Sequence, residues 1–189
     1  FVWSGEHNEN QDIYIRLLDG GNLLRLTSDP ADDLSPAWSP NGRRLAFFRD
    51  APDGGVYVVP TLGGTERKLA NAHTNRTRLT QQAFLCWSPD GQWLALADKT
   101  SPQEPYGIFL LSSETGEKRR LTAPPVATVG DLAPAFSPDG RWLAFIRSDG
   151  FALDDVYLVA ASGGAPVRLT FTHQQMSGLA WTADSRALI

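Results

Sequence analysis

The stretch LAPAFSPDGRWLAFIRS, residues 132–148, holds two short apolar runs on either side of a turn. The turn is Ser-Pro-Asp-Gly at 137–140, in which Pro presets φ and Asp-Gly suits the closing positions. Three related stretches occur elsewhere in the chain: LSPAWSPNGRRLAFFRD (34–50), AFLCWSPDGQWLALADK (83–99) and SGLAWTADSRALI (177–189). In the last copy TADS at 182–185 replaces the turn, so Pro and Gly are both missing there. One aromatic residue recurs at spacings of 49, 49 and 45 residues: Trp38, Trp87, Phe136 and Trp181.

A second signature alternates with the first: DIYIRLLDGGNLLRLT (12–27), GVYVVPTLGGTERKLA (55–70), GIFLLSSETGEKRRLT (107–122) and DVYLVAASGGAPVRLT (155–170). Each copy has two runs rich in β-branched and aromatic residues around a turn that contains Gly, which predicts a hairpin. One repeat therefore holds four short strands, named a, b, c and d here in chain order. Four strands in roughly 40–50 residues are typical of a β-propeller blade. We predict an all-β protein, a β-propeller of four four-stranded antiparallel blades.

The aromatic residue of strand a follows a small residue in every copy: Ala37, Cys86, Ala135 and Ala180. Neighbouring residues of a strand point to opposite faces of the sheet. The small residue is therefore expected to face one neighbouring blade and the aromatic residue the other, because a blade is stable only when both faces are covered.

The combination of SPDG, WLAF, DVYLV, GG and RLT resembles the PD-type repeat of the TolB-like β-propeller family, a relative of WD-repeat propellers. SPNG at 39–42 and SPDG at 88–91 and 137–140 carry this resemblance, which covers essentially the whole chain. The segment 12–27 also resembles propeller segments of multidomain bacterial signalling proteins. The resemblance implies a winged-helix regulator or a serine/threonine kinase domain outside the propeller, and neither is present in these 189 residues.

Both ends of the chain fall inside a strand b. TADSRALI (182–189) aligns with SPDGRWLA (137–144), and FVWSG at the start aligns with the continuation, Phe1 on Phe145. We expect a single domain with repeat units at about 1–33, 34–82, 83–131 and 132–176, and with 177–189 completing the unit begun at residue 1. This phase fits a chain that closes on itself as a four-blade ring, and it also fits a segment of a larger propeller, which we favour. The cut strand edges of such a segment would be prone to association.

Strands of a blade alternate in direction, so the a–b and c–d turns share one side, the turn side, and the b–c and d–a loops share the other, the loop side. Loops of varied length on a rigid scaffold are where binding usually occurs. We therefore predict a protein or a small ligand as the partner on the loop side. The candidate binding residues near these loops are His7, Asn10, Asp50, His73, Arg76, Tyr106, Asp131 and His173.

No catalytic, cofactor or metal site is predicted. The three histidines belong to different repeats without metal-ligand spacing, and TSDPADD (27–33) lacks the EF-hand pattern. The chain has no G-x-S-x-G, no P-loop and no G-x-G-x-x-G, and Cys86 is expected to be a buried small thiol. We predict that this segment is not an enzyme.

Four aspartates recur at repeat positions: Asp12 and Asp155 before strand c, and Asp90 and Asp139 in SPDG. A paired-carboxylate site is one interpretation. Recurrence in different repeats favours a structural role in strand entries and Asx-type turns. The basic run EKRR (117–120) is expected to be an exposed turn and strand edge.

The net charge of −4 argues against direct nucleic-acid binding, and no run approaches the ~18 apolar residues of a membrane span. A single cysteine excludes an internal disulfide, so bacterial cytoplasm and periplasm both stay open. Two functions are left. One is a non-catalytic binding or scaffold module of a larger bacterial signalling or transcription-regulator protein, which the resemblance of 12–27 favours. The other is the propeller domain of a prolyl oligopeptidase-type serine peptidase, with its catalytic domain outside this chain.

Overall fold

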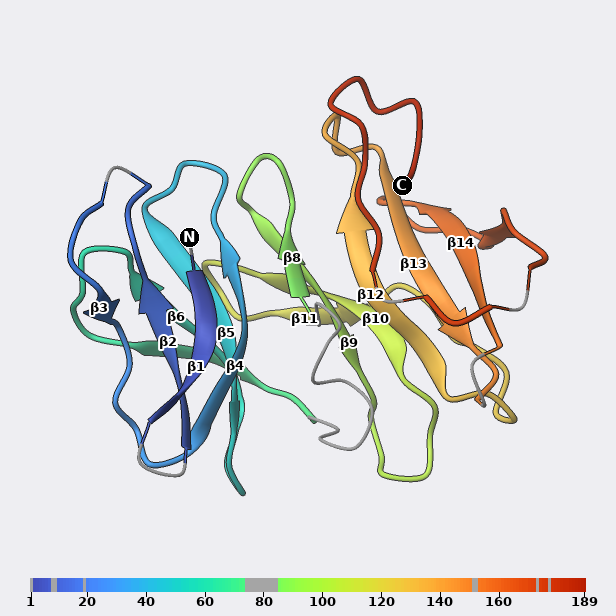
Figure 1. The fold of residues 1–189 in the computed structure, drawn as a ribbon. Helices are drawn as coiled ribbons and strands as arrows, with labels where there is room; N and C mark the ends of the chain where they lie inside the picture. The colour runs from blue at the N-terminus through green and yellow to red at the C-terminus, as the bar shows by residue number, and fades with distance from the viewer. Residues whose placement is uncertain are drawn as a thin grey trace. The chain divides into compact units, whose positions relative to one another are not determined.

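The computed structural model describes residues 2–7, 10–18, 20–73, 85–150, 153–172, 174–176 and 178–189. Within these ranges the chain forms antiparallel β-sheets and no helix (Figure 1). It divides into two compact units, Phe1–Thr74 (unit 1) and Asn75–Ile189 (unit 2).

Unit 1 contains two sheets. Sheet A has three strands in the order β1 (Val2–His7), β2 (Asn10–Ile15) and β3 (Leu24–Arg25). Sheet B has four strands in the order β4 (Asp32–Trp38), β5 (Arg44–Asp50), β6 (Gly55–Pro60) and β7 (Arg67–Asn71). The strands of sheet A correspond to b, c and d, and those of sheet B to a, b, c and d.

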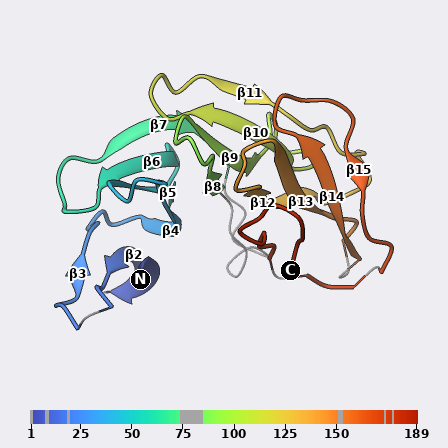
Figure 2. The same cartoon turned by 90° about the horizontal axis from the view of Figure 1, so that it is seen from above.

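Unit 2 contains two four-stranded sheets. Sheet C has the order β8 (Leu85–Trp87), β9 (Trp93–Asp98), β10 (Gly107–Ser112) and β11 (Lys118–Arg120). Sheet D has the order β12 (Gly130–Phe136), β13 (Trp142–Ser148), β14 (Asp154–Ala160) and β15 (Val167–Arg168), as seen from above in Figure 2. The predicted strand order a to d is confirmed in sheets B, C and D.

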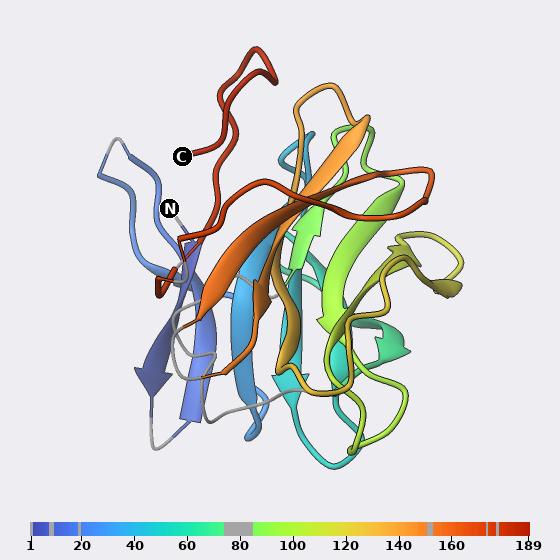
Figure 3. The same ribbon diagram turned by 90° about the vertical axis from the view of Figure 1, so that its right-hand side faces the viewer.

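Residues 178–189 form a short hairpin in unit 2. Trp181 is bridged to Leu188, and Ala180 and Ile189 exchange two backbone hydrogen bonds of 2.9 Å. Figure 3 shows this segment in red beside the orange strands of sheet D. The hairpin is the predicted strand a of the last repeat together with the first residues of its strand b.

The strand register changes one expected alignment. Trp3 pairs with Tyr14 in sheet A, and Phe145 pairs with Tyr157 in sheet D. Both tyrosines occupy the same position of strand c, so Trp3 and not Phe1 is the equivalent of Phe145. The alignment of Phe1 on Phe145 was therefore wrong by two residues. The short motif FVWSG could not define it, because a shift of two residues keeps the same side-chain faces.

Apolar residues at alternate positions form the core. In unit 1 the facing sides of sheets A and B bury Ile13, Ile15, Leu45, Phe47 and Val59. In unit 2 the fully buried side chains include Leu94, Leu96, Ile108, Leu110, Leu143 and Phe145. Three cross-strand aromatic pairs stack at 5.8–5.9 Å: Trp3–Tyr14, Phe47–Tyr57 and Phe145–Tyr157. Such pairs fix the register of strands b and c.

Candidate functional site

Local contacts place the predicted loop-side residues that the structure describes. Asn10 begins β2, and its Nδ2 donates a hydrogen bond of 2.7 Å to the backbone oxygen of Asp29. Asp50 ends β5 and is half-buried, and His73 is exposed after β7. The remaining candidates, the side chain of His7 and residues Arg76 and His173, lie outside the described residues.

Two other candidates, Tyr106 and Asp131, are buried, with 3% and 0% of their surface exposed. Tyr106 forms an isolated β-bridge with Gly130. The backbone N–H of Asp131 donates a hydrogen bond of 2.7 Å to the backbone oxygen of Tyr106. A Cβ at Gly130 would lie 2.2 Å from that oxygen, and its φ is +124°, so the contact requires glycine. Tyr106 and Asp131 thus fasten the 99–106 loop to β12 instead of lying open to a partner.

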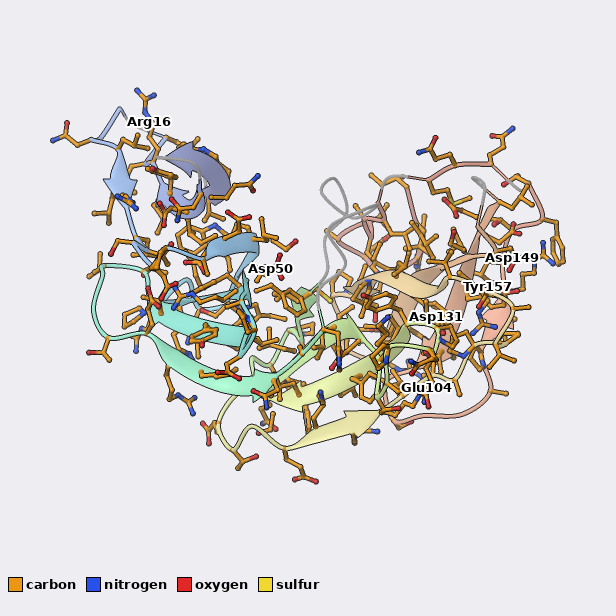
Figure 4. All side chains as sticks on the ribbon, turned by 90° about the horizontal axis from the view of Figure 1, so that it is seen from below. Arg16, Asp50, Glu104, Asp131, Asp149 and Tyr157 are labelled. Carbon is orange, nitrogen blue, oxygen red and sulfur yellow. The ribbon has the colours of Figure 1, made fainter. Side chains whose placement is uncertain are left out.

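An arginine of strand b holds a buried aspartate of strand a in two sheets. In sheet D, Arg147 donates to the two carboxylate oxygens of Asp131 at 2.6 and 3.0 Å. In sheet B, Arg49 binds Asp33 in the same way at 2.7 and 2.8 Å. The ring of a strand c tyrosine lies against each guanidinium. The distance from the guanidinium carbon to the ring centre is 4.4 Å for Arg147 and Tyr157 and 4.6 Å for Arg49 and Tyr57. Figure 4 shows Asp131 and Tyr157 in sheet D.

A threonine at the end of strand d links this aspartate to the preceding sheet. Thr122 of sheet C lies within hydrogen-bonding reach of Asp131, and its Oγ1 accepts from the Ile108 N–H at 2.9 Å. Thr27 of sheet A contacts Asp33 of sheet B in the same way. We call this set of Asp, Arg and Thr the loop-side latch. It fixes the loop side of sheets A and B in unit 1 and of sheets C and D in unit 2.

The latch keeps its charges paired in a poorly solvated place. Burial raises the pKa of Asp33 and of Asp131, against the opposing effect of the hydrogen bonds from their arginines. Burial also disfavours the charge of Arg49, but the hydrogen bonds and charges of Asp33 and Glu66 outweigh it and raise the pKa of Arg49. These groups are engaged with one another, so they are structural.

The sequence reasoning overlooked this latch. Its signal was present in two of the repeats: Asp33 and Asp131 each stand five residues before the aromatic residue of strand a, and Arg49 and Arg147 each stand eleven residues after it. In the last repeat that position is Met176, and there Thr170 donates its hydroxyl to Asp155 at 2.9 Å instead.

Asp12 and Asp155, predicted to precede strand c, lie inside it, in β2 and β14. They bind side chains of neighbouring segments, as the structural interpretation favoured above expects. Asp12 is fully buried, and the Arg25 guanidinium lies 2.5 Å from its Oδ2. Asp155 accepts from Arg168 at 2.5 Å and from the Thr172 N–H at 3.1 Å. In the EKRR run, Lys118 pairs with Asp98 at 2.6 Å and Arg120 with Glu104 at 3.3 Å, both on the exposed strand β11.

The a–b turns share one set of hydrogen bonds. In sheet D, the Ser137 hydroxyl donates to Asp139 Oδ1 at 2.6 Å, and the Arg141 N–H donates to the same oxygen at 3.0 Å. Sheet B makes the same turn with Asn41, whose Oδ1 accepts from the Ser39 hydroxyl at 2.9 Å and from the Arg43 N–H at 3.0 Å. The Asx-type turn predicted for Asp90 and Asp139 is confirmed.

The last repeat keeps this turn although it lacks Pro and Gly. The Thr182 hydroxyl donates to Asp184 Oδ1 at 2.6 Å, and the Arg186 N–H donates to it at 3.1 Å. Ser185 takes the place of glycine with a φ of +59°, against +72° at Gly140. The Ser185 hydroxyl accepts from the Asp139 N–H at 3.1 Å, so this turn contacts the preceding one.

A pocket of about 500 Å³ lies between the turns of sheets C and D, on the turn side of unit 2. Apolar side chains line its inner part: Trp93, Leu110 and Phe136. Three exposed charged side chains line its mouth: Asp90, Arg119 and Asp139. The Arg119 guanidinium carbon lies 5.5 Å from the centre of the Trp93 ring in sheet C. The same guanidinium donates a hydrogen bond of 3.2 Å to the backbone oxygen of Ala161, which follows β14 of sheet D, so Arg119 connects the two sheets.

The described residues offer neither a metal-binding cluster nor a reactive thiol. They contain no cluster of three or more His, Cys, Asp and Glu suited to a metal. Burial raises the pKa of the Cys86 thiol to about 12, so it stays protonated near neutral pH. Among the described residues, no helix is long and apolar enough to cross a membrane.

Known proteins resemble this chain in sequence and fold. No protein-family model matches it. An uncharacterized peptidase, YuxL, of Bacillus subtilis is 28% identical over 78% of this chain and 27% of that protein. A TolB homolog of Chlorobium chlorochromatii is 33% identical over 78% of this chain and 31% of that protein. The chain thus spans less than a third of the length of these relatives.

A solved structure, that of a putative TolB from Agrobacterium tumefaciens, superposes with a TM-score of 0.76 at 21% identity, covering 97% of this chain and 66% of that one. The fold class predicted from the repeats is confirmed: the chain is an all-β, four-blade segment of a β-propeller, similar to TolB-like propellers.

Proposed function

We propose that this chain is a non-catalytic β-propeller module of a longer bacterial protein with a signalling or transcription-regulating role, and that it binds a protein or a small ligand on its loop side. The observation that carries the proposal is the loop-side latch. The buried charged groups of the latch hold the strand ends in place. Rigid strand ends that carry loops of varied length are suited to binding a partner.

Exposed residues of the loop side are available for this binding. In unit 2, Gln103 lies in the b–c loop and Val126 in the d–a loop, and the Val126 side chain is 86% exposed. Both loops are anchored, one through Tyr106 and the other through Asp131. A partner would meet preformed loops, which lowers the entropic cost of binding.

The experiment is capture of cross-linked partners from a bacterial lysate by the wild-type chain and by two variants. The loop-side variant carries Gln103→Arg and Val126→Arg. The matched control carries Val167→Arg on the outer strand β15, where the side chain is 61% exposed. We expect the loop-side variant to lose a partner that the control retains. Equal capture by all three chains would contradict loop-side binding.

The second candidate function is the propeller domain of a prolyl oligopeptidase-type serine peptidase. The similarity to the B. subtilis peptidase over 78% of this chain favours it. In both cases the chain alone should not hydrolyse prolyl-p-nitroanilide substrates. The gene sequence beyond this segment decides between the two. A G-x-S-x-G motif with downstream Asp and His would support the peptidase, and a winged-helix or kinase domain would support the signalling protein.

A further inference from the structure

The pocket on the turn side of unit 2 has both an apolar interior and charged groups at its mouth. Leu110 is 2% exposed, and the rings of Trp93 and Phe136 are half-buried beside it. Asp90 and Asp139 are exposed and come from successive a–b turns. A ligand that fits must therefore combine an apolar part with a polar end.

The turns hold the two carboxylates in place. Asp90 Oδ1 accepts from the Ser88 hydroxyl at 2.5 Å and from the Gln92 N–H at 3.0 Å. Asp139 Oδ1 is bound in the same manner by Ser137 and Arg141. The hydroxyl of Ser137, followed by the Arg141 amide, lowers the pKa of Asp139, so its charge persists at neutral pH.

The charge of the lining favours a cation. Asp90 and Asp139 contribute two negative charges and Arg119 one positive charge. Arg119 is already committed to the Trp93 ring and to the Ala161 oxygen. Arg141 lies beside Asp139 without lining the pocket, and it offsets that charge in part. An anionic ligand would be repelled by both carboxylates, and a wholly apolar one would leave their negative charges uncompensated.

We propose that this pocket binds a lysine or arginine side chain of a partner polypeptide. The alkyl stem lies on Trp93, Leu110 and Phe136, and the charged end reaches the carboxylates of Asp90 and Asp139. Long basic side chains bury their stems on apolar surfaces and keep the charge at the rim. This site is on the side opposite the loops, so it goes beyond the function proposed above.

The chain supplies its own precedent for the variants. Sheet B makes the same turn with Asn41, so Asp90→Asn and Asp139→Asn should keep the turn and remove the charges. Asp184→Asn is the matched control, because Asp184 makes the same turn and does not line the pocket.

The test is a titration of the isotope-labelled full chain with the peptide Ac-Ala-Ala-Lys-Ala-Ala-NH2, followed by the indole N–H resonance of Trp93 in NMR spectra. A peptide with norleucine in place of lysine has the stem without the charge. We expect saturable shifts at Trp93 with the lysine peptide and an affinity about two- to fivefold weaker for each charge removed, as for exposed ion pairs.

Equal affinity of the lysine and norleucine peptides for the wild-type chain would overturn the proposal, and that comparison needs no variant to fold. So would the absence of a saturable shift at Trp93, or an effect of Asp184→Asn as large as that of the double variant. Any of these results leaves the loop-side proposal intact, because the capture experiment uses neither these residues nor this peptide.

Discussion

The indole Nε1 of Trp181 donates a hydrogen bond of 3.0 Å to the backbone oxygen of Ala135, which stands one repeat earlier in the chain. This contact joins the last hairpin to sheet D. Ala135 is the small residue of strand a in one repeat, and Trp181 is the aromatic residue of strand a in the next. In unit 2 this hydrogen bond fixes where the last hairpin lies against β12.

The first prediction concerns this hydrogen bond. Trp181→Phe keeps a large ring and removes the donor, so we expect a loss of about 1 kcal/mol of unfolding free energy. Chemical denaturation followed by circular dichroism measures it. Trp142→Phe, at a ring that is 38% exposed, is the control and should stay within about 0.5 kcal/mol. An equal loss in both variants would show that the Trp181 hydrogen bond is not responsible.

Trp87 is the most buried of the anchors on strand a, with 7% of its surface exposed against 39% at Trp38. Trp87→Ala should therefore destabilise the fold by about 3–5 kcal/mol, as a large-to-small change in a core. Trp38→Ala should lose less. A loss below about 1 kcal/mol for Trp87→Ala in denaturant unfolding would show that this ring does not anchor the sheet.

The loop-side latch predicts a specific need for the Thr122 hydroxyl. Thr122→Val nearly preserves the shape but leaves the buried Ile108 N–H without its 2.9 Å acceptor, which should cost about 1–3 kcal/mol. Thr122→Ser retains the hydroxyl and should recover most of this stability. Amide hydrogen exchange at Ile108 reports the local effect. Unchanged exchange in the valine variant would rule out the hydroxyl as the acceptor that matters.

Ser185 occupies a backbone conformation that the other a–b turns give to glycine. Ser185→Gly relieves the positive φ but loses the acceptor for the Asp139 N–H, so the two effects should nearly cancel. Ser185→Ala loses the acceptor and keeps the strain. We expect the glycine variant to exceed the alanine variant in stability by about 1 kcal/mol in thermal or denaturant unfolding. The reverse order would indicate that strain at this position is negligible.

The carboxylates of Asp139 and Asp184 should titrate below the ordinary aspartate pKa of 3.8. At Asp139 the Ser137 hydroxyl is the largest cause, followed by the Arg141 amide, so Ser137→Ala should move the pKa back up. Because the folded pKa lies below the unfolded one, this carboxylate stabilises the fold above the unfolded pKa. That contribution is lost as the pH falls through the folded pKa.

The measurement is an NMR titration of the Asp139 carboxyl carbon in the wild-type and Ser137→Ala chains. Asp184, whose pKa is lowered in the same way by Thr182, is an internal reference that Ser137→Ala should not move. A midpoint for Asp139 at or above 3.8 in the wild-type chain would contradict the assignment.

The sequence by itself determined the repeat, the four-strand units and the turns, because these depend on residues close together in the chain. The Ser137, Asp139 and Trp142 contacts span five residues, and the last repeat keeps them with Thr182 and Asp184 in place of the SPDG motif. A pattern of side chains within one turn is readable without knowing where the rest of the chain lies.

Only the tertiary structure decided which polar residues are buried and which are exposed. Asp131 was predicted at the binding face from its place in a loop, and it is buried because Arg147, sixteen residues away, and the Tyr106 backbone meet it there. The pocket likewise depends on Asp90 and Asp139, which belong to different repeats. Burial and charge pairing follow from packing between sheets, and the spacing of residues within a repeat does not encode that packing.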